Sequence, residues 1–394
     1  MRVSTASPVR VIVMTTVPET LEAFFQCQLR SLAEAGFEVH AVSSPGAGLN
    51  ALGGISGVTV HAIPMERKPH PVKDCVSLLR LIRLFRRVRP HIVHAHTPKA
   101  GLLGMTAAKV ARVPARLYTV HGLPLLTRSG LLRRVLKAAE RMSARLATRT
   151  YSVSQSVRQL MIEMKLCSAD RVSVLGDGSC AGVDLNRFNA DADWSLKRMA
   201  VRSALNIPRD AVLVSFVGRL ARDKGIGVLA AAWPGLAREL PHLHLLLAGD
   251  PDRTDPLPAS LFEQLLAHGE RVHLTGSIAG PEVPAIYAAS DIFVLPTFRE
   301  GLSQVALEAG AMGVPIVSCQ VSGLDAVQDG VTGLLVPPGN PVALANAIAS
   351  LATNPEFRNR LGVAAKKHVR DHYSEERVNR MWMSEYQLLV RKWA

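Results

Sequence analysis

Short apolar runs alternate along the chain with longer stretches of helical periodicity. Apolar runs rich in β-branched and aliphatic residues indicate strands, whereas apolar residues that recur every third or fourth position indicate helices. The alternation continues through the whole sequence and is typical of parallel sheets covered by helices. The predicted strands occupy residues 9–14, 38–43, 91–95, 116–120, 150–153, 211–217, 243–248, 272–274, 292–295, 315–318 and 333–336. Helical stretches include residues 21–35, 76–88, 131–148, 227–239 and 342–352.

The 394 residues are enough for two α/β domains, each a doubly wound, Rossmann-like parallel sheet. Polar residues 189–193 and the turn at 206–210 indicate the boundary between them. We therefore predict an N-terminal domain at 1–195 and a C-terminal domain at 196–373. Residues 374–394 contain Trp382, Tyr386 and Trp393 and are expected to form one last helix that returns to the N-terminal domain.

Composition excludes several classes of protein. With 48% apolar and 20% charged residues, the chain is neither disordered nor fibrous. Its 5 cysteines are scattered singly, without zinc-ligand spacing, which favours a reducing cytoplasm and no metal site. No run reaches the roughly 18–20 apolar residues of a membrane span, and residues 1–8 lack a signal-like apolar core. We expect a protein that is not integral to a membrane.

The positive charge is concentrated in the first half. Residues 1–190 carry 26 lysines and arginines against 11 acidic residues, whereas the remainder carries 20 against 21. Basic amphipathic stretches at 73–89 and 128–149 suit the headgroup layer of an anionic membrane. Alternatively, their apolar faces cover the first sheet and the cations are solvated. Nucleic acid is disfavoured as a partner because the basic residues lack clustered aromatics for stacking.

A glycine-containing turn with two cations follows the predicted strand at 211–217. The string V-G-R-L-A-R-D-K-G places Gly218 beside Arg219, with Lys224 five residues further on. Glycine allows close backbone approach, and the next helix offers free N–H groups to an anion. The spacing suits a nucleotide-diphosphate leaving group, although a solvated basic loop would have the same pattern. The glycines match neither the Walker A nor the dinucleotide pattern.

Two glutamates, Glu300 and Glu308, follow the predicted strand at 292–295. Ligands of open α/β sheets bind at the carboxyl ends of strands, and carboxylates accept hydrogen bonds from the vicinal hydroxyls of a sugar and a ribose. A solvated helix face is the alternative. Glu308 argues against it, because no other charge stands between Gly301 and Leu324 and a carboxylate in apolar surroundings needs a partner.

Taken together, these motifs resemble the retaining glycosyltransferases of family 4, which have the GT-B fold. The resemblance rests on G-R-x4-K-G at 218–225, E-x7-E at 300–308, G-V-P-I-V at 313–317 and D-G-x-x-G-L-L-V at 329–336. In the first half, residues 94–101, 118–122 and 153–156 look like the bacterial members that build surface polysaccharides on lipid carriers. The resemblance implies two domains that face each other across a cleft, with the donor held by the second domain and the acceptor by the first.

The resemblance also implies roles for single residues. Arg219 and Lys224 would bind the diphosphate and stabilise its departure, while Glu300 would contact the donor sugar and Glu308 the ribose. His121 would face the donor sugar, or else cap the following turn. The expected catalytic residues are His121, Glu300, Arg219 and Lys224. The expected donor-binding residues are Gly218, Arg219, Lys224, Ile278 at the base, Glu300, Gly301, Leu302 and Ser303 through backbone N–H groups, and Glu308.

The first domain is expected to hold the acceptor through Glu19, His96 and Lys99, with His94 structural. Many family members carry Gly-Gly after the first strand, where this chain has T-T-V-P-E-T at 15–20. The bulkier loop is expected to shape the acceptor site through Glu19 or Glu22 instead of contacting a phosphate.

The expected activity is transfer of a hexose or N-acetylhexosamine from a nucleotide sugar, UDP-linked by resemblance, to a polyprenyl-diphosphate-linked saccharide. Retention is expected through front-face substitution, because neither glutamate fits a nucleophile. No cofactor and no metal are expected, since Arg219, Lys224 and a helix N-terminus would stabilise the leaving diphosphate. We expect a cytoplasmic protein, peripheral to the inner face of the membrane. The rivals are a nucleotide-sugar epimerase of the same fold and a non-catalytic membrane-associated binding protein.

Overall fold

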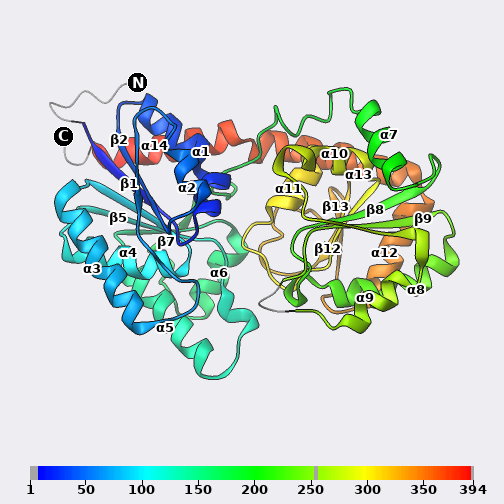
Figure 1. Ribbon diagram of the computed structural model, residues 1–394, viewed down its shortest axis with the longest axis horizontal. Helices are drawn as coiled ribbons and strands as arrows, with labels where there is room; N and C mark the ends of the chain where they lie inside the picture. The colour runs from blue at the N-terminus through cyan, green and yellow to red at the C-terminus, as the bar shows by residue number, and fades with distance from the viewer. Residues whose placement is uncertain (1–7, 253–255, 392–394) are drawn as a thin grey trace. The chain divides into compact units, whose positions relative to one another are not determined.

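The computed structural model describes residues 8–252 and 256–391, which divide between two compact units (Figure 1). Unit 1 comprises residues 8–182 and 375–391, and unit 2 comprises residues 183–374. Trp393 and residues 1–7 lie outside the described part. Unit 2 begins earlier than the boundary predicted at 195, because the Val183 amide donates to the Tyr373 carbonyl (2.8 Å) and the ring of Phe188 packs on Tyr287.

The described part of unit 1 is built on a seven-stranded parallel sheet with the order β3-β2-β1-β4-β5-β6-β7. Strand order reverses between β2 and β4, on either side of β1, as in doubly wound folds. The strands are β1 Arg10–Met14, β2 Glu38–Ser43, β3 Val58–Ala62, β4 Ile92–His96, β5 Ala115–Val120, β6 Arg149–Ser152 and β7 Val172–Val174. The pattern did not predict β3 and β7, which are the two edge strands.

Helices cover both faces of this sheet (Figure 1). On one face lie α1 Pro18–Glu34, α2 Ala47–Leu52 and α14 Glu375–Val390; on the other lie α3 Pro71–Val88, α4 Pro98–Val110, α5 Gly130–Leu146 and α6 Gln155–Glu163. The rings of Trp382 and Tyr386 on α14 are fully buried with Phe25 of α1. The last helix therefore completes the core of unit 1, although it follows unit 2 in the sequence.

Unit 2 repeats the architecture with a six-stranded parallel sheet of order β10-β9-β8-β11-β12-β13 among its described residues. Its strands are β8 Val212–Val217, β9 Leu243–Ala248, β10 Val272–Gly276, β11 Ile292–Leu295, β12 Ile316–Cys319 and β13 Gly333–Val336. Its helices are α7 Ser195–Ala204, α10 Val283–Ala289, α11 Gln304–Ala311 and α13 Pro355–Tyr373 on one face, and α8 Ile226–Glu239, α9 Ala259–Leu266 and α12 Pro341–Thr353 on the other (Figure 1).

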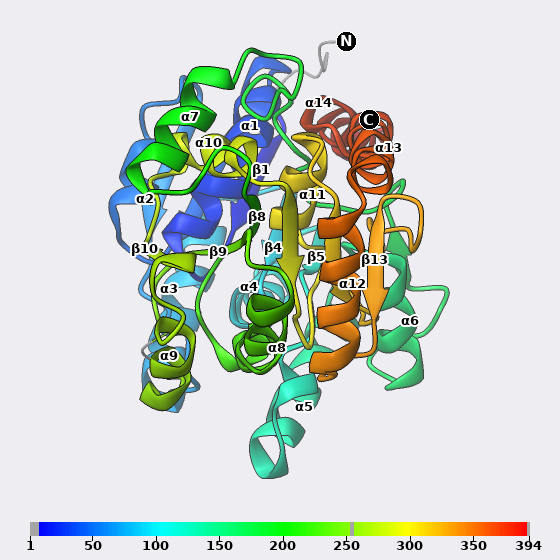
Figure 2. The same ribbon diagram turned by 90° about the vertical axis from the view of Figure 1, so that its right-hand side faces the viewer.

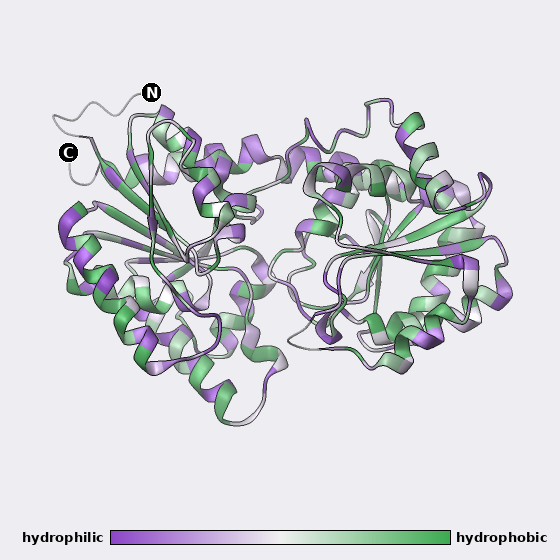
Figure 3. Ribbon diagram, viewed as in Figure 1, coloured by the Kyte–Doolittle hydropathy of each residue, from purple (hydrophilic) through white to green (hydrophobic). Residues whose placement is uncertain are grey.

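Hydrophobic residues fill the space between sheet and helices in each unit. The strands are coloured largely hydrophobic in Figure 3, and polar residues gather on the outer helix surfaces. Figure 2 shows α12 lying beside β13, a packing that buries Leu344, Ile348 and Leu351. Continuous apolar strands of this kind are expected where a parallel sheet is covered on both faces. The two doubly wound sheets predicted from the sequence are confirmed.

One buried carboxylate stands out in unit 1. Glu140 on α5 is 2% exposed and accepts a hydrogen bond from the Tyr118 hydroxyl at Oε2 (2.7 Å). Its Oε1 has no hydrogen-bond partner among the described residues. Burial raises the pKa of the Glu140 carboxyl to about 7, partly offset by the Tyr118 hydrogen bond. The folded state therefore favours the protonated acid.

This burial predicts a pH-dependent loss of stability. When folding raises the pKa of an acid, its contribution to stability is greatest below the pKa of the unfolded state. This contribution is lost as the pH rises to the pKa of the folded state. We expect the melting temperature to fall between about pH 4.5 and 7 and to fall less in Glu140→Gln, a difference worth about 3 kcal/mol at most. Calorimetry across this range checks it, with exposed Glu163→Gln as the control. Parallel curves for wild type and Glu140→Gln would contradict it.

Candidate functional site

Three loops of unit 2 meet where β8, β9 and β11 end. Backbone hydrogen bonds join the first two loops: the Leu220 amide donates to the Asp250 carbonyl (2.9 Å) and the Asp252 amide to the Leu220 carbonyl (3.1 Å). Gly249 has φ +150°, and a Cβ there would lie 1.9 Å from the Gly218 carbonyl oxygen. The loops can approach this closely because Gly249 has no side chain.

A largely buried ion pair joins the β8 and β11 loops. Lys224 Nζ lies 2.7 Å from Glu300 Oε1, with side-chain exposures of 20% and 11%. Gly225 follows with φ +73°, and a Cβ there would lie 1.8 Å from the Pro296 carbonyl oxygen. The backbone amide of Glu300 donates to the Ser322 carbonyl (3.1 Å). This hydrogen bond holds the backbone from which the Glu300 carboxylate extends. The two residues that the sequence assigned to phosphate and sugar are thus in direct contact.

Asp223 organises the same corner, and sequence reasoning missed it. Its carboxylate accepts from the Arg299 guanidinium (2.9 Å), and its carbonyl accepts from the Phe298 amide (2.9 Å) and the Thr297 hydroxyl (3.0 Å). Asp223 and Arg299 stand inside the two motif strings, but the pattern gave no sign that they pair. Their contacts hold the β11 loop against the β8 loop.

Arg219 differs from Lys224 in exposure. Its side chain is 54% exposed and forms an ion pair with Asp252, with the Asp223 carboxylate 3.9 Å from its guanidinium. Arg219 lines a pocket of about 390 Å³ with Gly218, Asp250 and Ile278 among its other walls. The Lys224, Glu300 and Glu308 side chains do not line that pocket, so the structure gathers the predicted donor residues only in part.

Glu308 has the partner that its apolar surroundings require. The Tyr287 hydroxyl donates to Glu308 Oε2 (3.3 Å), and burial raises the pKa of the Glu308 carboxyl to about 7. Gly301 and half-buried Leu302 lie in the turn before α11. Ser303 corrects one expectation: its amide donates to the Gly323 carbonyl (3.2 Å) and so is not free for a phosphate, whereas its buried hydroxyl has no partner among the described residues.

Three histidines meet at the end of β4 and β5 in unit 1. His121 follows β5, is partly exposed, and lies 2.9 Å from His96 through Nε2 and Nδ1 respectively. His94 and His96 are both fully buried on β4. The prediction that His96 binds the acceptor directly is therefore wrong for this structure. Burial lowers the pKa of the His121 imidazole to about 4, so it is neutral at pH 7.

The other two predicted acceptor residues have different surroundings. Lys99 Nζ contacts both carboxylate oxygens of Asp74 (2.7 and 3.0 Å) and the Lys68 carbonyl (2.6 Å). This ion pair holds α4 to α3, and the acceptor contact of Lys99 stays a prediction. Glu19 is exposed in the first turn of α1, so its carboxylate remains accessible to a ligand.

The threonines that replace the Gly-Gly pair have a structural use. Thr16 Oγ1 lies 2.8 Å from Thr97 Oγ1 and accepts from the Ala100 amide (3.2 Å) at the start of α4. The β1 loop is thereby tied to the β4 loop, where Thr97 has φ +69°. A glycine in place of Thr16 would remove both contacts.

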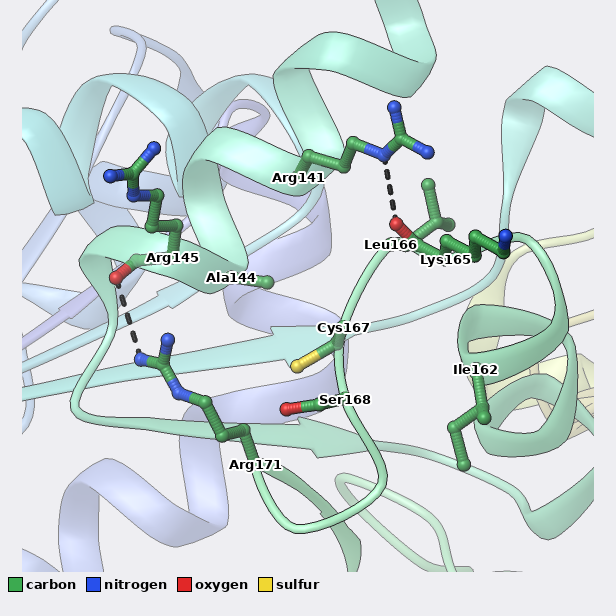
Figure 4. Close-up of a pocket in the computed structure, with 9 residues that line it drawn as sticks. All are labelled: Arg141, Ala144, Arg145, Ile162, Lys165, Leu166, Cys167, Ser168 and Arg171. Atoms are coloured by element: carbon green, nitrogen blue, oxygen red, sulfur yellow. Dashed lines mark hydrogen bonds between the residues drawn. The ribbon is translucent and has the colours of Figure 1, made fainter.

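A second pocket, of about 520 Å³, lies between α5 and the loop 165–171 (Figure 4). The segments that line this pocket lead into the N-terminal ends of β6 and β7. The pocket therefore lies on the opposite side of unit 1 from the carboxyl ends of β4 and β5. Its walls carry Arg141, Arg145, Lys165 and Arg171. Arg141 Nε donates to the Lys165 carbonyl (2.8 Å) and Arg171 Nη2 to the Ala147 carbonyl (2.9 Å). None of the predicted site residues lines this pocket.

Comparison with known proteins matches both halves of the chain to glycosyltransferase families. Residues 211–354 match "Glycosyl transferases group 1", and residues 21–178 match "Glycosyl transferase 4-like domain". The capsular polysaccharide biosynthesis glycosyltransferase CapM of Staphylococcus aureus is 32% identical over 350 residues, which are 89% of each chain.

A second relative and one solved structure are informative. The UDP-Gal:alpha-D-GlcNAc-diphosphoundecaprenol alpha-1,3-galactosyltransferase of Escherichia coli is 29% identical over 261 residues, covering 64% of this chain and 63% of that enzyme. HepE of Anabaena in complex with UDP-glucose has a TM-score of 0.79 at 19% identity, covering 96% of this chain and 99% of HepE. This likeness concerns the fold, and the predicted GT-B fold is confirmed.

The close contact at Gly225 predicts a strong effect of one methyl group. In Gly225→Ala, the positive φ and the overlap with the Pro296 carbonyl oxygen should destabilise the protein by more than about 1 kcal/mol. Gly235→Ala is the matched control, because Gly235 lies inside α8, a Cβ there would meet nothing within 4 Å, and alanine favours helix. Melting temperatures should fall in the first variant and stay or rise in the second. Equal melting temperatures for the two would contradict this account of the loop.

Proposed function

The chain belongs to the group 1 glycosyl transferases, and we propose that it transfers a hexose or N-acetylhexosamine from a UDP-linked donor to a polyprenyl-diphosphate-linked saccharide, with retention. The observation that carries the proposal is the Lys224–Glu300 ion pair at the carboxyl ends of β8 and β11. It puts a cation and a hydrogen-bond acceptor side by side where a phosphate and a sugar adjoin in such a donor. The names of the E. coli relative and of the HepE complex support this donor and acceptor class.

Donor binding would use the two cations differently. Lys224 is held in place by Glu300, so its ammonium is pre-positioned for a diphosphate oxygen. Arg219, which is half exposed and paired with Asp252, would turn its guanidinium from that carboxylate to the phosphate. Exchange of one anion for another keeps the guanidinium paired throughout. The pocket beside Gly218 and Ile278 would receive the nucleoside.

Glu300 and Glu308 would recognise hydroxyl groups. With Oε1 occupied by Lys224, Oε2 of Glu300 remains for a sugar hydroxyl. Glu308 shares its site with the Tyr287 hydroxyl, and its carboxyl would accept from the ribose. A ribose hydroxyl that donates to Glu308 stabilises the ionised form and offsets its burial. These assignments extend the expectations from the sequence.

The chemistry we propose is front-face substitution. The bond between the anomeric carbon and the diphosphate oxygen breaks, leaving an oxocarbenium-like sugar and a diphosphate stabilised by Lys224 and Arg219. The incoming hydroxyl attacks from the same side and gives its proton to the oxygen that the sugar has left. Neither glutamate is assigned as a nucleophile, because we assign Glu300 to Lys224 and a sugar hydroxyl, and Glu308 to Tyr287 and the ribose.

The first test is UDP release from a UDP-sugar with a lipid-linked acceptor. Lys224→Ala and Glu300→Gln should each lower the rate by about 100-fold or more, because each removes one half of the ion pair that positions the transition-state charge. Arg238→Ala is the control for loss of a cation, since Arg238 is 82% exposed on α8. Wild-type rates in Lys224→Ala would contradict the proposal. Interconversion of the donor without acceptor would indicate an epimerase, and no turnover at all a binding protein.

Membrane association is proposed through α5. This helix of 17 residues buries only Glu140, Ser143 and Ala144 within the described residues of unit 1. Leu131, 75% exposed, and Leu132 stand among its arginines. By contrast, α3 buries Leu81, Leu84 and Phe85 against the sheet, which favours the covering role for that helix. Along the described ranges, no helix has the length and apolar character needed to cross a bilayer.

The membrane proposal predicts binding to anionic vesicles that depends on α5. Each cation near such a surface contributes about 1 kcal/mol, so Arg133→Gln/Arg134→Gln/Lys137→Gln should weaken cosedimentation with phosphatidylglycerol vesicles by about 100-fold. The control Lys367→Gln/Arg370→Gln/Arg380→Gln removes the same charge from exposed sites elsewhere. Equal weakening by both triple variants, or binding to pure phosphatidylcholine that salt does not affect, would overturn the role of α5.

A further inference from the structure

The buried histidines of unit 1 form a defined geometry next to His121. Strand β4 pairs with β5 so that His96 lies opposite Thr119, and His94 and His96 share one face of the sheet. His96 Nδ1 lies 2.9 Å from His121 Nε2. Among the described residues, His96 is the hydrogen-bond partner of the His121 ring. One proton therefore lies between two ring nitrogens.

All three rings are neutral at pH 7. Burial lowers the pKa of His96 well below its ordinary value, and the neighbouring His94 and His121 lower it further. Burial also lowers the pKa of His121 to about 4 and that of His94 to about 3. A neutral imidazole carries one N–H and one bare nitrogen, so the proton shared by His96 and His121 determines the tautomer of both.

The shared proton can belong to His96 Nδ1 or to His121 Nε2, and the surroundings of the other His96 nitrogen distinguish these two tautomers. His96 Nε2 is buried and has no hydrogen-bond partner among the described residues. The ring packs against Phe25 (centroids 4.1 Å apart, planes at 40°) and His94 (4.0 Å, 38°), two neighbours that offer no hydrogen-bonding atom to Nε2. If His121 donated to His96, the proton of His96 would sit on Nε2 as a buried N–H without acceptor. Among backbone groups, buried N–H groups without an acceptor are rarer than acceptors without a donor, and we apply the same preference to this imidazole.

We infer that His96 is a positioning residue: its Nδ1–H donates to His121 Nε2 and holds His121 in the tautomer that carries its proton on Nδ1. His121 then presents a hydrogen-bond donor, and its basic nitrogen is already occupied. In the proposed transfer, on which this consequence rests, His121 would donate to a sugar oxygen and would not accept the proton of the incoming hydroxyl. That proton is left for the departing diphosphate.

His94, whose ring packs against His96, is itself held in place. Its Nδ1 lies 2.6 Å from the Tyr386 hydroxyl and its Nε2 2.7 Å from the Thr119 hydroxyl, so both ring nitrogens are paired. The Trp382 ring packs on His94 with centroids 4.9 Å apart. Because Trp382 and Tyr386 belong to α14, the orientation of His96 depends on the C-terminal helix.

The inference is tested first without any activity, by nitrogen-15 NMR of the full-length protein with labelled histidines. Long-range proton–nitrogen spectra should show His121 protonated at Nδ1 and bare at Nε2 in the wild type, with the His121 signals assigned by their loss in His121→Gln. In His96→Phe, which keeps an aromatic ring at this position, His121 should lose this preference. Protonated Nε2 in the wild type, or an unchanged tautomer in His96→Phe, would overturn the inference whatever the enzyme transfers.

The second test is kinetic and uses the transferase assay. His96→Phe should lower kcat by about tenfold, the effect of one hydrogen bond in the transition state, while His96→Asn, whose amide can donate from the Nδ1 position, should restore most of it. His40→Phe is the matched control, because His40 is buried on β2 and pairs with His61 at 3.0 Å in the same sheet. Equal losses in His96→Phe and His96→Asn, or in His40→Phe, would indicate a merely structural role.

Discussion

The candidate site of unit 2 depends on backbones that touch where no side chain fits. Gly249 lies against the Gly218 carbonyl, Gly225 against the Pro296 carbonyl and Gly323 against the backbone of Glu300. These contacts draw the loops after β8, β9 and β11 together and bring Lys224 to Glu300. Without these backbone contacts the two loops would lie further apart, and Lys224 and Glu300 would each be solvated separately. The chemistry of the site is thus set by backbone packing first and by side-chain charge second.

Much of the fold follows from the sequence because most central strands are rich in apolar, β-branched and aliphatic residues. The edge strands β3 and β7 escaped prediction, since an edge strand is short or only half buried and loses the continuous pattern. The boundary between the units was placed too late because Val183 and Phe188 are bound to unit 2 by partners far along the chain. Periodicity reports local structure and carries no information on such partners.

The candidate site was predicted more completely in unit 2 than in unit 1. Its glycines, cations and glutamates occur in dense motifs, so their positions in the structure follow from two strand-to-helix turns. The residues of unit 1 stand alone in the sequence, and their environment decides their use. Lys99 pairs with Asp74, which lies 25 positions away, and His96 is fully buried beside Phe25 and His94. Neither fact leaves a sign in the neighbouring residues.

The place of α14 has a consequence for how the chain is made. Its Trp382 and Tyr386 complete the core of unit 1, yet all of unit 2 lies between them and the strands they cover. During synthesis, every residue of unit 2 leaves the ribosome before unit 1 has its full set of core side chains. Unit 1 is therefore the last to be finished, and a premature stop anywhere within unit 2 leaves both units incomplete.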